Sequence, residues 1–165
     1  MNATQKIFAA VAIVATQAVV LPGQAADDRD ALAGVKELKA VFDIQEGDGK
    51  RLLNRLTLID ETRASLVAQG VRPHFVLAFR GPATRLIQTD PAKIRPEDRD
   101  ITAIIATKLD EMRDAKGIEG LQLCAIAIRG QGTKAENVIP AVKIVGNTWV
   151  SLMAYQSRGY AYIAP

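Results

Sequence analysis

Leu121-Gln122-Leu123-Cys124-Ala125-Ile126 is the stretch around which the fold is organised. It continues an apolar run that begins at Ile118, and the polar, glycine-containing residues 129–133 follow soon after it. This pattern predicts a buried strand over residues 118–124 that ends at the single cysteine of the chain. The next few residues, up to Ile128, suit either an extension of that strand or the beginning of a helix.

Strand-like and helix-like segments alternate on both sides of this stretch. Apolar runs predict strands, and apolar residues that recur every three or four positions predict helices. The predicted strands span residues 35–44, 74–79, 118–124, 142–145 and 160–163. The predicted main helices lie between Lys50 and Gly70, between Pro96 and Gly117, and between Asn147 and Gly159. This alternation predicts an α/β protein with a single flavodoxin-like domain, in which a mainly parallel five-stranded sheet lies between two helical layers.

Two shorter helical elements are also expected. Residues 83–88 form one candidate, and Thr133-Lys134-Ala135-Glu136 matches the capping box that begins many helices. The helix after this box must be short, since Pro140 follows it. In the last main helix, Trp149, Leu152, Met153 and Gln156 fall on one side.

Residues 1–25 have the layout of a signal peptide. Lys6 lies in a short polar start, residues 7–21 are almost wholly apolar, and small residues precede a possible cut after Ala25. A membrane anchor is the alternative, but the apolar run is short for a span of roughly 20 residues. We therefore expect cleavage, a flexible mature N-terminus over residues 26–34, the domain itself over residues 35–165, and a periplasmic or secreted protein with no membrane segment after cleavage.

Composition and motifs argue against several function classes. The formal charge of +3 falls to +2 without Lys6, the remaining charges are interleaved, and aromatic residues make up only 5% of the chain, so nucleic-acid binding is not expected. One cysteine and one histidine, His74, predict no internal disulfide and no structural zinc site. Residues 130–135 match a dinucleotide fingerprint only loosely and follow the wrong strand, so no cofactor is predicted.

The candidate site residues are Cys124 as the catalytic thiol and Arg80 and Gly81 as ligand-binding residues. Ligands of parallel sheets collect beyond the carboxyl ends of the strands, and all three residues lie at such ends. A helix beginning directly after Cys124 would favour the thiolate, and Arg80 can offset its charge or bind an anion. On chemistry alone, a working thiol and a buried packing residue remain equal alternatives for Cys124.

Two other polar residues are assigned by their position along the predicted strands. His74 begins the second strand and is expected at the end of the sheet opposite to the site. Asp43 ends the first strand and could reach the same cleft as Arg80, although a single acidic residue there often serves a turn.

The mature chain resembles the exported branch of the DsrE/DsrF-like family. The resemblance rests on a cysteine that closes a strand, on Pro140 before a short strand, on Phe79-Arg80-Gly81-Pro82, and on the tail Gln156-Ser157-Arg158-Gly159-Tyr160-Ala161-Tyr162-Ile163. It implies a flavodoxin-like fold, homo-oligomers that are often trimers or hexamers, and transfer of sulfane sulfur between cysteine persulfides. Cys124 matches the cysteine position of that branch.

The resemblance leads to two hypotheses for function. The first is a periplasmic sulfur-binding or sulfur-relay protein, a carrier rather than a turnover enzyme, that receives sulfur on Cys124 from a protein or a small sulfur compound. The second is a non-enzymatic homo-oligomeric binding or structural module that keeps the fold without sulfur transfer. Two departures from the branch favour the second: Ile126-Ala127 replaces a polar pair, and Arg80-Gly81 replaces His-Gly.

Overall fold

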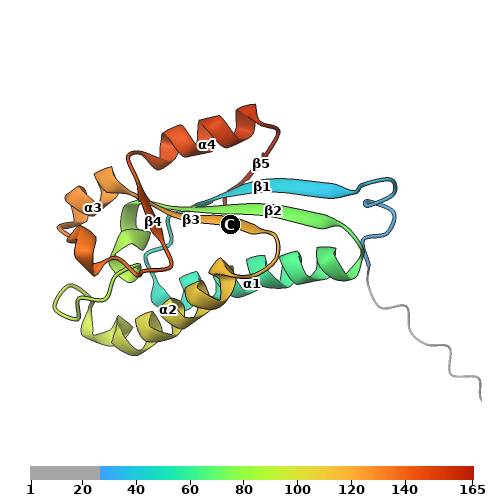
Figure 1. The fold of residues 1–165 in the computed structure, drawn as a ribbon. Helices are drawn as coiled ribbons and strands as arrows, with labels where there is room; N and C mark the ends of the chain where they lie inside the picture. The colour runs from blue at the N-terminus through green and yellow to red at the C-terminus, as the bar shows by residue number, and fades with distance from the viewer. Residues whose placement is uncertain (1–26) are drawn as a thin grey trace, which may run out of the picture.

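Five parallel strands form the central layer, in the order β4-β3-β2-β1-β5 (Figure 1). The computed structural model describes residues 27–165. The strands are β1 (Glu37–Ile44), β2 (Arg72–Phe79), β3 (Ile118–Cys124), β4 (Lys143–Val145) and β5 (Ala161–Ile163). The predicted α/β class, parallel sheet and single flavodoxin-like domain are confirmed, with β2 as the central strand.

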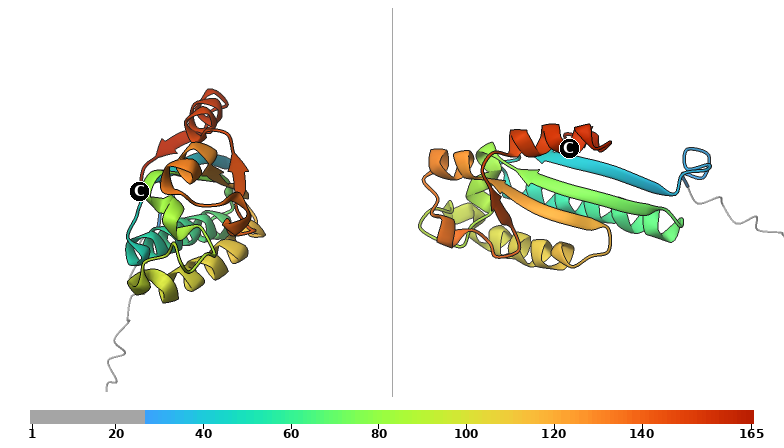
Figure 2. Two further views of the ribbon diagram at one scale, coloured as in Figure 1. Left: turned by 90° about the vertical axis from the view of Figure 1, so that its left-hand side faces the viewer. Right: turned by 45° about the horizontal axis from the view of Figure 1, so that its top comes forward.

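Helices cover both faces of this sheet (Figure 2). The main helices are α1 (Gly49–Ala68), α2 (Arg99–Arg113), α3 (Ala125–Gln131) and α4 (Thr148–Ser157). The short 3₁₀ helices are η1 (Gly81–Leu86), η2 (Pro96–Asp98) and η3 (Ala135–Asn137). The helices α1 and α2 pack on one face and α4 on the other, whereas α3 lies beside η1 at the carboxyl end of the strands (Figure 1).

The larger core lies between the sheet and the pair α1 and α2. Leu56 of α1 and Leu109 of α2 are fully buried against inward side chains such as Leu77 of β2. A smaller cluster on the other face places Leu152 of α4 over Val76 of β2. Because β2 is covered on both faces, its sequence is continuously apolar from Phe75 to Phe79 instead of alternating.

Side-chain caps explain where two helices begin. Asp48 Oδ1 accepts from the Arg51 amide at 2.9 Å before α1, and Asn147 Oδ1 accepts from the Trp149 amide at 2.9 Å before α4. The predicted cap at Thr133 is wrong: its hydroxyl is buried without a hydrogen-bond partner. Thr133 instead closes α3, since its amide donates to Ile128 O at 3.1 Å, and only the single turn η3 follows.

The predicted signal peptide, residues 1–25, lies outside the described residues and stays a prediction. Residues 27–34, predicted as a flexible N-terminus, form turns in which the Leu32 amide donates to Asp28 O at 2.9 Å. The Asp28 amide donates to Gln69 Oε1 at 3.3 Å, which joins these turns to the end of α1. Over residues 27–165, no helix has the length and apolar character needed to cross a membrane.

Candidate functional site

A pocket of about 190 Å³ opens where β2, β3 and β4 reach their carboxyl ends. Its lining residues are Arg80, Gly81, Cys124, Ile126, Ala127, Asn147, Thr148 and Trp149. All three site residues predicted from the sequence therefore lie in one pocket. The parallel strands explain this convergence, because their carboxyl ends meet at one edge of the sheet.

Cys124 lies where β3 passes into α3. Its backbone is still extended, and the helix begins at the next residue, Ala125, so the helical alternative for residues 125–128 is the correct one. The residue is only 5% exposed. Its thiol therefore lies at the protein side of the pocket, beside backbone amides of the first turn of α3.

The surroundings of Cys124 favour its ionised form. Burial is the largest single influence and acts to raise the pKa of the thiol. The backbone amide of Thr148, the amide of Ala127, the Thr148 hydroxyl and the amide of Ile126 act in the opposite direction. Together these donors prevail, and the pKa of Cys124 lies below its ordinary value, which increases the fraction of reactive thiolate at neutral pH.

Thr148 supplies two of these donors from a different helix. It is the first residue of α4 and is 0% exposed. Its Oγ1 has no hydrogen-bond partner among residues 27–165 while Cys124 is a neutral thiol. A buried hydroxyl without a partner costs about 1–3 kcal/mol. A sulfur anion on Cys124 is a suitable acceptor for it. The sequence reasoning missed Thr148, although its place directly after the helix cap Asn147 was the available signal.

Arg80 is held beside the pocket by Asp43. Its Nε donates to Asp43 Oδ1 and its Nη2 to Oδ2, both at 2.7 Å, and the Asp43 carboxylate is almost completely buried. Tyr162 of β5 also donates to Asp43 Oδ2, at 2.6 Å. The hydrogen bonds that Arg80 donates to Asp43 raise the pKa of Arg80 above its usual range, so Arg80 keeps its charge.

Trp149 fixes the guanidinium from another side. Arg80 Cζ lies 5.6 Å from the centre of the Trp149 ring, in the range of a cation–π contact. Trp149 itself is 58% exposed. Of the residues that the sequence placed on one side of α4, only Leu152 is buried. The guanidinium is oriented by two neighbours while its Nη1 has no hydrogen-bond partner among the described residues. This free group can bind an anion in the pocket.

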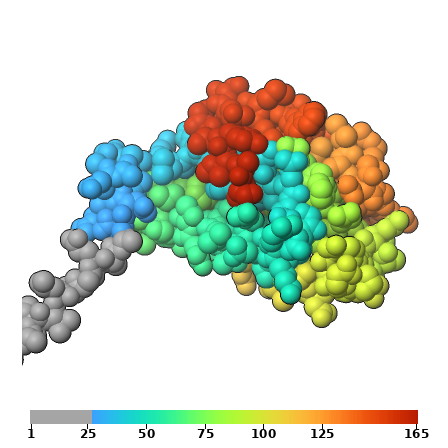
Figure 3. All heavy atoms as spheres, turned by 180° about the vertical axis from the view of Figure 1, so that it is seen from behind, coloured from blue at the N-terminus to red at the C-terminus, as the bar shows by residue number. Residues whose placement is uncertain are grey.

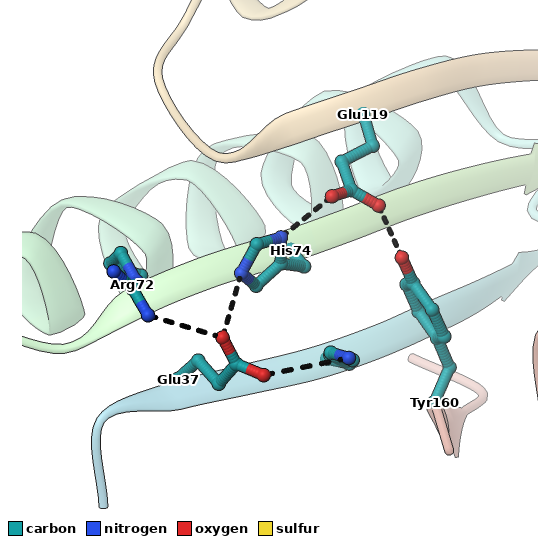
Figure 4. A network of polar contacts seen from close by, with 6 residues as sticks. Glu37, Arg72, His74, Glu119 and Tyr160 are labelled. Carbon is teal, nitrogen blue, oxygen red and sulfur yellow. Dashed lines mark hydrogen bonds and ion pairs between the residues drawn. The ribbon is translucent and has the colours of Figure 1, made fainter. Parts of the chain in front are cut away.

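His74 belongs to a separate network on the α4 side of the sheet (Figure 4). Its Nδ1 lies 2.6 Å from Glu119 Oε1, and the Tyr160 hydroxyl donates to the other oxygen of Glu119. Its Nε2 faces Glu37 Oε2 at 3.7 Å. His74 is the third residue of β2, whereas Arg80 follows the last one, so the histidine takes no part in the pocket. Among the described residues, no group of three or more His, Cys, Asp or Glu side chains is placed to hold a metal ion.

Comparisons with known proteins support the fold and name no activity. No protein-family model matches the chain. An uncharacterized protein of Aquifex aeolicus (strain VF5) is 30% identical over 127 residues, which are 76% of this chain, and the chain spans about 55% of the length of that relative. The solved structure of MTH1491, a protein of unknown function from Methanobacterium thermoautotrophicum, matches 79% of this chain and 99% of its own, with a TM-score of 0.54 and 19% identity. At that identity the likeness concerns the fold alone.

Proposed function

We propose that this protein is an exported, periplasmic sulfur carrier of the DsrE/DsrF-like kind, which holds sulfane sulfur as a persulfide on Cys124. One observation carries the proposal. The lone thiol faces a pocket of about 190 Å³, and donors from the first turns of both α3 and α4 lower its pKa. A lowered pKa increases the fraction of thiolate, which is the form that attacks a sulfane sulfur.

The transfer needs no external oxidant. The Cys124 thiolate attacks the outer, sulfane sulfur of a donor persulfide and forms a new S–S bond. The S–S bond of the donor breaks, its electron pair stays with the inner sulfur, and the donor leaves as a thiolate that takes a proton from water. Cys124 keeps the transferred sulfur as a persulfide, and the reverse reaction with an acceptor thiolate releases it.

Two residues support this chemistry from the pocket wall. The Thr148 hydroxyl, which has no ordinary partner, can donate to the sulfur anion before and after transfer. Arg80 provides a positive charge that is oriented by Asp43, and a persulfide, polysulfide or thiosulfate ion carries the opposite charge. The exported branch tends to have a histidine at this position, and the proposal assigns Arg80 the role of the charged group here.

Intact-mass measurement after exposure to inorganic polysulfide tests the proposal. We expect the wild-type protein to gain the mass of one or more sulfur atoms, and dithiothreitol to remove it. Cys124→Ser is the control and should gain nothing. The absence of an adduct on the wild type, or an equal adduct on Cys124→Ser, would contradict the proposal.

A homo-oligomeric binding or structural module is the second candidate. The exposed apolar side chains of Trp149, Val150 and Met153 on α4, with Ile126 of α3, favour it, since contiguous apolar surface often marks a protein contact. This candidate predicts a trimer or hexamer and a thiol that reacts with iodoacetamide only after unfolding. Fast alkylation of the native protein would count against a role for Cys124 as packing alone.

A further inference from the structure

A second pocket, of about 380 Å³, lies on the face of the sheet covered by α1 and α2. It is lined by residues of β1, α1 and β5, by Phe75 of β2 and by Pro165 at the end of the chain, and it shares no lining residue with the Cys124 pocket. Figure 3 shows the C-terminal segment reaching toward α1 on this side of the molecule. The two pockets are therefore independent sites.

The geometry of the edge strand explains why this pocket is open. β5 pairs with β1 only at residues 40–42, and all three of its residues are exposed. Helix α1 packs under β2, so the side chains of Ala161 and Ile163 face α1 across a gap. Leu58 of α1 and Ile163 of β5 are 46% and 40% exposed on either side of it. Ligand pockets of proteins have this size and this mainly apolar lining.

Arg55 supplies the positive charge of this pocket. No Asp or Glu lines it, and the last residue of the chain, Pro165, lies on its wall. Lys39 also lines it, but its ammonium group belongs to the network on the α4 side of the sheet. Lys39 is paired with Glu37 at 3.5 Å. Arg55 is half-buried on α1 and forms no ion pair and no side-chain hydrogen bond with any of residues 27–165. A free guanidinium beside apolar walls is complementary to a molecule with an apolar chain and an anionic head.

We propose that this pocket binds an amphiphilic monocarboxylate, with its hydrocarbon chain against Phe42, Leu58 and Ile163 and its carboxylate on Arg55. Binding here buries apolar side chains that are otherwise in contact with water, which is favourable in proportion to the area covered. The carboxylate supplies the partner that Arg55 lacks. Neither contribution involves Cys124, so the inference does not depend on the proposed sulfur chemistry.

Calorimetric titration of the full chain with three probes of equal chain length tests this proposal. The probes are octanoate, 1-octanol and octylammonium, each below its aggregation concentration. We expect octanoate to bind most tightly, and Arg55→Gln to weaken octanoate about tenfold while leaving 1-octanol unchanged. Arg51→Gln is the matched control: Arg51 lies on the same helix but is paired with Glu46 at 3.1 Å outside the pocket.

A second variant and a second measurement keep the result interpretable. Ala161→Phe fills the pocket from β5 and should weaken octanoate and 1-octanol alike, and NMR shifts of the Ile163 methyl groups should follow octanoate binding. Equal binding of octanoate and octylammonium, equal effects of Arg55→Gln and Arg51→Gln, or no octanoate binding because a second copy of the chain covers the pocket would each overturn the proposal. Cys124→Ser should bind octanoate like the wild type, which separates this test from that of sulfur transfer.

Discussion

Arg80 and Asp43 form a two-pronged ion pair across β1 and β2, with Nε to Oδ1 and Nη2 to Oδ2 both at 2.7 Å. The adjacent strands place them side by side, since Asp43 is paired in register with Ala78, two residues before Arg80. The carboxylate is buried and the guanidinium lines the Cys124 pocket. The pair therefore links the stability of the sheet to the charge of the site.

Removal of the arginine should destabilise the fold. We expect Arg80→Gln to lower the free energy of unfolding by about 3 kcal/mol, because Asp43 then stays buried without its cation. Urea unfolding of Arg80→Gln, of Asp43→Asn and of the double variant measures the coupling free energy between the two side chains. Additive effects of the two single substitutions would show that the ion pair is not coupled.

Thr148→Val should separate stability from reactivity. Valine has nearly the shape of threonine but no hydroxyl, and the Thr148 hydroxyl has no partner while Cys124 is a neutral thiol, so we expect the free energy of unfolding to rise by about 1 kcal/mol at acidic pH. The same substitution removes a donor to Cys124, so the pKa of the thiol should rise and alkylation at neutral pH should slow. Unfolding curves and iodoacetamide rates measured on the same samples check both effects. A destabilised variant with unchanged reactivity would assign Thr148 a packing role only.

The pH dependence of Cys124 follows from the sign of its shift. Burial is opposed by stronger donation from Thr148 and the α3 amides, and the folded pKa lies below the ordinary value of 9.0 for a thiol. The thiolate therefore contributes stability that is fully present above the ordinary thiol pKa of 9.0 and is lost as the pH falls through the folded pKa. The difference in unfolding free energy between the wild type and Cys124→Ser should grow with pH across that window. A constant difference would mean that the thiol is not shifted.

The hydrogen bond from Tyr160 to Glu119 should delay the titration of Tyr160 at alkaline pH. Burial and the hydrogen bond to Glu119 raise the pKa of Tyr160 to about 12. Because the folded pKa is the higher one, this contribution to stability is present below about pH 10 and is lost as the pH rises toward 12. Phenolate absorbance of the wild type minus that of Tyr160→Phe should show the late titration. A midpoint near pH 10 would contradict the hydrogen bond between Tyr160 and Glu119.

Two glycines should respond in opposite directions to alanine. Gly117 has φ +96°, and an added Cβ would lie 2.5 Å from Pro73 Cγ, so Gly117→Ala should cost about 2 kcal/mol or more. Gly130 lies inside α3 with open space around it, so Gly130→Ala should stabilise by about 0.5–1 kcal/mol. Thermal unfolding of both variants measures the contrast, and similar effects at the two sites would contradict the backbone assignment at Gly117.

Much of the site was predictable because it depends on where strands end. Apolar runs located β2 and β3, and parallel strands bring their carboxyl ends together, so Arg80, Gly81 and Cys124 were expected near one another. The ion-pair partner of Arg80 was harder to predict from the sequence. Asp43 was expected near the cleft, but its pairing with Arg80 depends on the register of β1 and β2, which no local pattern encodes.

Residues that reach the site from distant segments were not predictable in the same way. Tyr162 contacts Asp43 across 119 positions of sequence, because β5 returns to pair with β1 and not with β4. Thr148 comes to Cys124 because α4 begins directly beyond the end of β4. The misassigned cap at Thr133 has a related cause: its local pattern suited a helix start, but its amide was already used to close α3.

The sequence by itself determined the alternation of strands and helices, the parallel sheet, and Cys124 as the residue at the end of β3. Those properties follow from local hydrophobic period and from the general geometry of crossover connections. Only the tertiary structure decided the surroundings of the thiol: burial, opposed by amides from two helices, the unpartnered Thr148 hydroxyl, and Arg80 oriented by Asp43. The pKa of a cysteine depends on donors and charges within a few ångströms, and in this protein they come from segments that only folding brings together.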